Sequence, residues 1–157
     1  MKMIFLLLLL GLNGCGFHFR GHEKPPQTIT HLSVVPYTPY HITYQFLERT
    51  FANRHVVVDP AHSAYILTLL GDHLDTYALA YGTDGRLRKE KYIYTLRFSL
   101  EDAAHQKLIP ENRIVVEREQ YLNPNQDLAD EQEKQILQQD MRQEAIRLLV
   151  DEVVFWQ

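Results

Sequence analysis

Three groups of residues in this 157-residue chain have types and spacings that could support chemistry. The first is a single cysteine, Cys15, at the end of an apolar N-terminal stretch. The second is a short segment from Asp72 to Asp75 that is rich in potential metal ligands. The third is a run of cations from Arg86 to Lys91. Each group predicts a different function, namely lipid attachment, metal binding and anion binding.

The N-terminus is typical of a bacterial lipoprotein signal. Lys2 supplies a positive charge, an apolar run follows, and Gly14 is a small residue directly before Cys15. The apolar run is shorter than the roughly 20 residues that a membrane-spanning helix needs. We therefore expect residues 1–14 to be removed and Cys15 to carry acyl chains, each buried CH2 contributing about 0.8 kcal/mol to membrane binding. The residue after the cysteine is Gly16 rather than the aspartate that typically retains lipoproteins in the inner membrane, which favours the outer membrane. The alternatives are a secretory signal with a chance cysteine and a buried N-terminal helix.

The remaining polar groups do not form a recognisable active site in the sequence. The chain has eight histidines, but the ligands between Asp72 and Asp75 have no partner motif, and a polar hairpin arm explains them as well. Glu117 and Glu119 share one strand face, which is more typical of a solvated surface than of paired catalytic acids. An acylated Cys15 leaves no thiol for catalysis. The sequence thus predicts no catalytic residue, no metal and no cofactor, with a periplasmic hydrolase as an open alternative.

The cation run could bind an anion. The chain has a formal charge of −4, so it is not a general nucleic-acid binder, and basic residues concentrated in one hairpin stand out. For a membrane-tethered protein, a phosphorylated lipid is a sensible ligand. The alternative is a charged strand end that keeps the hairpin soluble, with Glu90 offsetting part of the charge. The candidate residues are Arg86, Arg88, Lys89 and Lys91, with Arg97 farther along the strand.

The apolar periodicity that must position these residues predicts a mixture of strands and two helices. In the N-terminal half we expect strands at residues 17–20, 29–35, 56–58 and 64–70. A bulge or bend near Gly71 would let the last of these continue toward Tyr81. A helix is expected from Thr38 to about Arg54, because Tyr44, Leu47 and Phe51 recur at helical spacing together with Tyr40.

The C-terminal half predicts a hairpin, one further strand and a long helix. Residues 82–85 form a turn, after which one set of alternating residues should face the core and the other a polar surface. A strand at about 113–122 and a helix from about Asp127 follow. The inward sets are Tyr92, Tyr94, Leu96, Phe98 and Leu100 on the hairpin strand, Ile114 and Val116 on the next, and Ile136, Met141, Ala145, Leu148 and Leu149 on the helix.

These elements predict the fold class. With one apolar face each, the helices are most simply buried on one side of one sheet, so we expect an α+β two-layer sandwich with two helices on a roughly four-stranded, mostly antiparallel sheet. The domain should span residues 15–157.

The string from Cys15 to Gly21 reads CGFHFRG. This string resembles the start of the mature members of the LptE family of LPS-assembly lipoproteins. Weaker similarity lies in Tyr121-Leu122-Asn123, in Leu128-Ala129 and in the segment from Met141 to Ala145, and the order of strands and helices also agrees.

The resemblance implies a function that composition and spacing alone do not show. Members of this family are non-enzymatic plug and assembly subunits that form a one-to-one complex with the β-barrel LptD at the periplasmic side of the outer membrane, bind lipopolysaccharide and assist its transport. By this resemblance Arg86, Arg88, Lys89 and Lys91 are the residues that would contact lipopolysaccharide. Asp130 and Glu131 disfavour such a contact at the start of the last helix. The alternative is an unrelated periplasm-facing lipoprotein that acts as an adaptor or lipid carrier.

Overall fold

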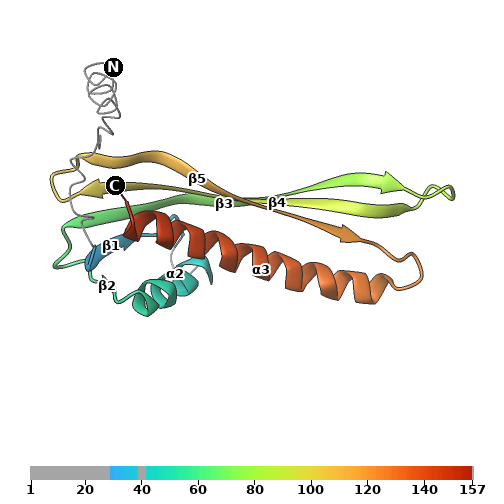
Figure 1. Ribbon diagram of the computed structural model, residues 1–157, viewed down its shortest axis with the longest axis horizontal. Coiled ribbons are helices and arrows are strands. Elements are labelled where there is room, and N and C mark those ends of the chain that lie inside the picture. The colour runs from blue at the N-terminus through green and yellow to red at the C-terminus, as the bar shows by residue number, and fades with distance from the viewer. Residues whose placement is uncertain (1–28, 39–41, 157) are drawn as a thin grey trace, which may run out of the picture.

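The protein is a long, narrow sheet covered on one face by two helices (Figure 1). The structure is a computed structural model that describes residues 29–38 and 42–156, with only the backbone described at Ile42. In chain order the elements are β1 (His31–Val35), α2 (Ile42–Asn53), β2 (Val57–Val58), β3 (Tyr65–Tyr81), β4 (Leu87–Asp102), β5 (Lys107–Tyr121) and α3 (Asp127–Val154).

Three long strands form the body of the sheet. β3 pairs with β4 and β4 with β5, both antiparallel, through turns at residues 82–86 and 103–106. At 17 residues, β3 is roughly 55 Å long, so the sheet projects well beyond the N-terminal strands. We call this projection the arm; it consists of β3 beyond Thr68 and the segments of β4 and β5 beside it. The expected continuation of β3 to Tyr81 is confirmed. β5 begins at Lys107, earlier than the predicted start at Arg113.

The sheet has five strands rather than the predicted four, in the order β2-β1-β3-β4-β5. The two-residue β2 lies within the strand expected at residues 56–58, and it pairs in parallel with His31 and Leu32 of β1. β1 also runs parallel to β3, so antiparallel pairing is confined to the three long strands.

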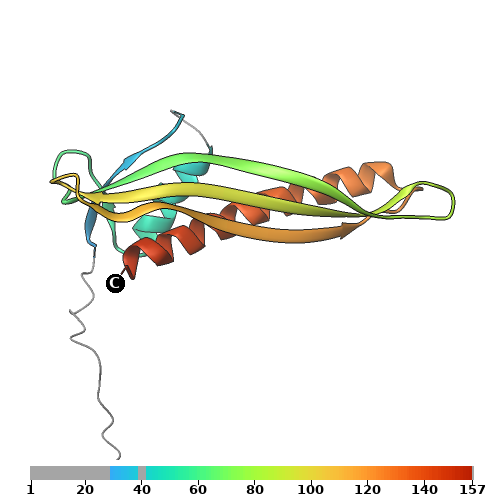
Figure 2. The same cartoon turned by 90° about the horizontal axis from the view of Figure 1, so that it is seen from above.

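Both helices lie on the same face of the sheet, which confirms the predicted two-layer α+β arrangement (Figure 2). The alternating residues of β4 from Tyr92 to Leu100 are buried beneath them, as predicted. α2 contributes Leu47 and Phe51, which are both fully buried. With 12 residues, α2 is about 18 Å long, whereas the 28 residues of α3 extend for about 42 Å. α2 therefore covers only part of the length of α3.

The buried face of α3 differs from the predicted stripe because of this difference in length. Met141, Ala145 and Leu149 are buried as expected, but Ile136 and Leu148 are 62% and 44% exposed. The C-terminal half of α3 packs against both the sheet and α2, which widens its buried face to include further residues, namely Ile146, Val150, Val153 and Val154. The N-terminal half packs on the sheet alone and leaves Ile136 at its margin.

Some predictions fall on residues that the structure does not describe. These are the signal segment and Cys15, the strand at residues 17–20, Tyr40, and the first turn of the helix predicted from Thr38. Within the described ranges, α2 ends at Asn53, one residue before the predicted end. The apolar content of α2 and α3 is insufficient for either helix to cross a bilayer.

Candidate functional site

A bulge in β3 decides where the predicted metal ligands point. The pairing of β3 with β4 shifts between Leu69 and Gly71, and Gly71 adopts φ +136°, a backbone conformation that favours glycine. Leu67 and Leu69 face the helices before the bulge; after it, the even-numbered residues do. The bulge therefore turns Asp72 inward, where its side chain is only 12% exposed.

The inward carboxylate of Asp72 organises a polar cluster between the sheet and the helices. It accepts hydrogen bonds from the hydroxyl groups of Tyr37 and Tyr94, the latter at 2.5 Å. Arg142 of α3 places Nε 4.0 Å from the carboxylate and its guanidinium 5.8 Å from the centre of the Tyr94 ring. Thr43, at the start of α2, is fully buried beside these groups. The cluster thus joins β3, β4 and both helices at one point.

The predicted metal-ligand group is divided between the two faces of the sheet. Asp72 faces the helices, whereas His73 lies on the opposite face and bonds to Asp75 through Nε2 at 3.0 Å. The side chains of His73 and Asp75 are 74% and 41% exposed. Over residues 29–38 and 42–156, no three His, Cys, Asp or Glu side chains are grouped as a metal site would require. The segment is a bulge with one inward acid.

Burial and hydrogen bonding raise the pKa of two tyrosines of the sheet, Tyr92 and Tyr94. Burial, and then the hydrogen bond to Asp72, raises the pKa of Tyr94 far above its ordinary value. Burial, followed by the hydrogen bond to Glu90 at 2.5 Å, does the same to the pKa of Tyr92. Both hydroxyl groups therefore stay neutral under alkaline conditions that ionise exposed tyrosines.

This difference predicts that the protein loses stability at high pH. Above about pH 10 the tyrosines of the unfolded chain release protons, while Tyr92 and Tyr94 retain theirs in the folded state. The unfolded state then binds fewer protons, so the free energy of unfolding should fall as pH rises, by about 1–2 kcal/mol between pH 9 and pH 11. Urea titrations at the two pH values measure this loss, and Tyr94→Phe should reduce it. A free energy of unfolding that is constant over this range would contradict the assignment.

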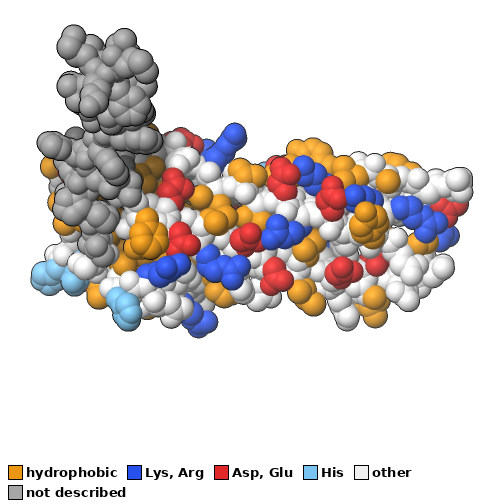
Figure 3. Space-filling model, viewed as in Figure 1, with side chains coloured by type: hydrophobic (Ala, Val, Ile, Leu, Met, Phe, Trp, Pro, Cys, Tyr) orange, Lys and Arg blue, Asp and Glu red, His pale blue; other side chains and the backbone are white. Residues whose placement is uncertain are grey.

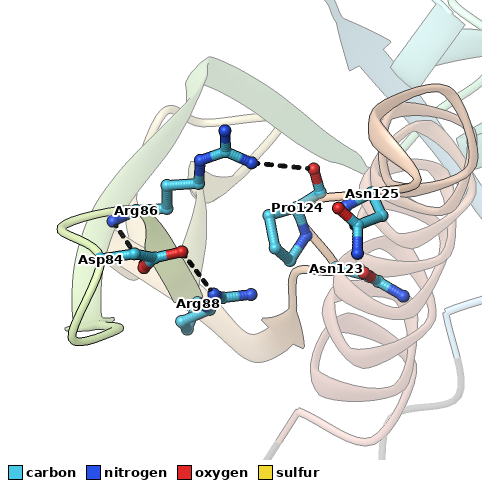
Figure 4. Close-up of polar contacts among 6 residues, drawn as sticks. All are labelled: Asp84, Arg86, Arg88, Asn123, Pro124 and Asn125. Carbon is cyan, nitrogen blue, oxygen red and sulfur yellow. Dashed lines mark hydrogen bonds and ion pairs between the residues drawn. The ribbon is translucent and has the colours of Figure 1, made fainter.

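The predicted cation patch is split between the two faces of the arm. Strand alternation places Arg86 and Arg88 on the same side of β4 as Tyr92, near the hairpin turn. Arg88 forms an ion pair with Asp84 at 2.8 Å, and Arg86 donates to the carbonyl oxygen of Pro124 at 3.4 Å (Figure 4). Arg88 therefore links its strand to the hairpin turn at the tip of the arm, and Arg86 links the tip to the β5–α3 connection.

Lys89 and Lys91 occupy the opposite, helix-free face. Lys89 pairs with Glu119 at 2.5 Å and lies 4.8 Å from the ring centre of Tyr121, and Lys91 pairs with Glu117 at 2.6 Å. The hydrogen bond to Glu119 is the main reason that the pKa of Lys89 is raised. The glutamates that alternate along β5 are thus the partners of these lysines. Cations and acids are also interspersed over the face seen in Figure 3.

A cavity of about 460 Å³ lies beside Arg86, between the arm and the start of α3. Tyr92 and Gln120, both almost completely buried, line it together with Arg86 and Lys134. Its other charged lining residues are acids, namely Glu90, Asp127, Asp130 and Glu131. The excess of acids makes this cavity a poor site for an anion, so the helix-free face offers the better position for one. The sequence alone did not indicate this cavity.

Comparison with known proteins agrees with this architecture. A model of the LptE family, described as lipopolysaccharide-assembly, matches residues 29–153. The LPS-assembly lipoprotein LptE of Photorhabdus laumondii is 26% identical over 161 residues, covering 98% of this chain and 87% of that protein.

Solved structures share the fold at low sequence identity. Lipoprotein B from Nitrosomonas europaea, determined by NMR, is 20% identical with a TM-score of 0.71 and covers 80% of this chain and 83% of that chain. The rare lipoprotein B from Shewanella oneidensis, a crystal structure, is 19% identical with a TM-score of 0.66 over 78% of this chain and 89% of that chain. Because the family model covers all the described helices and strands except the final residue of α3, the chain belongs to the LptE lipopolysaccharide-assembly family.

Proposed function

We propose that the chain is a non-enzymatic lipoprotein that assists lipopolysaccharide assembly at the periplasmic side of the outer membrane. Residues 1–14 are its signal peptide, and acyl chains on Cys15 hold residues 15–157 at the membrane. Its partner is a β-barrel of the LptD type, bound one to one. The observation that carries this proposal is the family match over residues 29–153.

The shape and surface of the domain support a role inside a barrel. The longest strand, β3, is roughly 55 Å long, and most of the cations of β4 form ion pairs with neighbouring acids. A surface of this kind gains little from contact with lipid, whereas the lumen of a large membrane barrel is polar and can accommodate it. A narrow domain with paired charges suits the role of a plug.

We also assign lipopolysaccharide contact to the four cations of the arm, in two separate groups. Lys89 and Lys91 share the helix-free face, while Arg86 and Arg88 lie near the tip on the other face. A single phosphate group could therefore engage one pair but not all four. Ion pairs such as that of Lys91 with Glu117, in which both side chains reach solvent, contribute only about 0–1 kcal/mol and can exchange a carboxylate for a phosphate.

Removing both lysines should weaken lipopolysaccharide binding. For the double variant Lys89→Ala/Lys91→Ala we expect the Kd for purified lipopolysaccharide to rise about tenfold, equivalent to about 1.4 kcal/mol. Surface plasmon resonance at low salt measures this change. The matched control Lys107→Ala/Arg113→Ala removes two cations from the half of β5 that lies farther from the arm's tip and should leave Kd within about threefold. Equal losses of affinity for lipopolysaccharide in both double variants would contradict binding at Lys89 and Lys91.

Affinity purification from the native envelope tests the proposed function as a whole. A C-terminal tag on the full chain should recover the LptD-type barrel at one-to-one stoichiometry, as measured by quantitative mass spectrometry. Depletion of the chain should leave that barrel misassembled, because its plug would be absent during folding. Recovery of a different envelope protein, with the barrel unaffected by depletion, would instead favour an unrelated adaptor or lipid carrier.

A further inference from the structure

The arm has two long sheet edges without a neighbouring strand among the described residues. On the β3 side, pairing with β1 ends at Val35 and Thr68, and the rest of β3 as far as Tyr81 has a strand partner only in β4. On the other side, β5 pairs only with β4. An unpaired edge exposes backbone N–H and C=O groups and is a template for another extended chain.

The two edges differ in how they resist such pairing. β5 has charged side chains and a proline distributed along its length, which are devices that discourage the addition of a strand. They are Lys107, Pro110, Glu111, Arg113, Glu117, Arg118 and Glu119. β3 has charged or polar side chains that would discourage strand addition only near its middle, where His73 pairs with Asp75. The six residues from Thr76 to Tyr81 contain neither a charge nor a proline.

This uncharged part of β3 also exposes apolar surface. Tyr77, Leu79 and Tyr81 are 51%, 44% and 64% exposed. The ladder to β4 is locally irregular between Ala78 and Tyr81 but returns to its original register. Open backbone groups next to exposed apolar side chains are the two components that strand addition uses, the first for affinity and the second for specificity.

We propose that the edge of β3 from Thr76 to Tyr81 binds an extended, uncharged segment of a partner protein by strand addition. The inference rests on the proposed function, in which that partner is the barrel. The strands of a closed barrel are already paired with one another, so the segment must come from a luminal loop or an extended terminus of the partner. The arm would thereby gain a further strand on its unprotected side.

The strand predicted at residues 17–20 is too far along the chain from β1 to pair with this edge. Extrapolated along the parallel register of Ser33 with Ile66, Ile29 lies roughly 46 Å before Thr76. The nine residues that connect Arg20 to Ile29 extend over at most about 32 Å, so the strand predicted at residues 17–20 ends short of Thr76. A second copy of the chain on the same edge would double the sheet and conflict with a one-to-one complex.

A charge placed on the edge tests this inference, and the other edge provides a matched control. Leu79 and Val115 are aliphatic residues on opposite edge strands, exposed to 44% and 42%. In the co-expressed full-length complex, Leu79→Lys should raise the Kd for the barrel at least tenfold, whereas Val115→Lys should leave it within about threefold. Both variants should unfold cooperatively at nearly the wild-type temperature, because neither residue is in the core.

Hydrogen exchange on the wild-type complex provides an independent readout. Barrel binding should slow exchange of alternate amides between Thr76 and Tyr81 at least tenfold, because only alternate N–H groups of an edge strand point away from its existing neighbour. Three results would each overturn the inference. They are equal effects of Leu79→Lys and Val115→Lys on the Kd, amide exchange that barrel binding leaves unchanged, and a dimer of the chain formed through β3. Failure of the wild-type chain to bind any barrel would instead overturn the proposed function itself.

Discussion

Replacement of Cys15 by serine should transfer the protein from the membrane fraction to the soluble fraction. A single acyl chain gives only marginal membrane binding and stable anchoring takes a second signal, so removing every chain should lower the ratio of bound to free protein by about a hundredfold or more. Fractionation of cells that express the Cys15→Ser variant measures the shift.

Mass spectrometry of the wild-type protein provides the chemical control for this experiment. The mature chain should begin at Cys15 and carry the mass of attached acyl groups. Gly16→Ala, next to the modified residue, should remain in the membrane fraction, because it keeps the thiol. An intact N-terminus with an unmodified cysteine in the wild-type protein would refute the anchor.

Replacement of Asp72 by alanine should destabilise the fold more than any surface substitution in the arm. The change removes the acceptor of two tyrosine hydroxyl groups and the nearest carboxylate to Arg142, whose Nε is buried without a hydrogen-bond partner in the part of the chain described. Breaking a largely buried polar cluster of this kind should lower the free energy of unfolding by about 3 kcal/mol. Urea denaturation at neutral pH measures this loss.

Asp75→Ala is a matched control for the Asp72 prediction. The residue type and the strand are the same, but Asp75 lies on the opposite face, where it pairs with a well-exposed His73. Its loss should cost less than about 1 kcal/mol. The double variant Asp72→Leu/Arg142→Met should recover more than half of the lost stability, because it removes both charges together. Similar losses for the two aspartate variants would show that the cluster does not stabilise the fold.

The fold class could be predicted because the decisive patterns are local. The alternation from Tyr92 to Leu100 and the turn at residues 82–85 lie within a few positions of one another, and the structure confirms both. Features that depend on tertiary contacts, such as the burial of individual helix residues, could not be predicted from these local patterns. Leu148 matches the periodicity of α3, yet whether it is buried depends on where the shorter α2 lies, and no sequence pattern reports that position.

The candidate sites show a similar division between what sequence can and cannot establish. The separation of Arg88 from Lys89 follows from strand alternation, so it could have been predicted once the strand was recognised. The burial of Asp72 could not have been predicted in this way. It requires the bulge to reverse the alternation of side chains along β3 between Leu69 and Asp72. A possible bulge near Gly71 was indicated, but its effect on the following side chains depends on which residue is the unpaired one.

The mixed pairing of the sheet has a consequence for the order in which the protein folds. β3, β4 and β5 are connected by short turns, so their two hairpins can close within microseconds, whereas Ser33 must find Ile66 across the whole α2 connection. Folding should therefore nucleate in the C-terminal meander, and β1 should dock late. If Cys15 is acylated as proposed, that end of the chain stays kinetically independent of the nucleus, and the arm can form while the lipid is still being delivered.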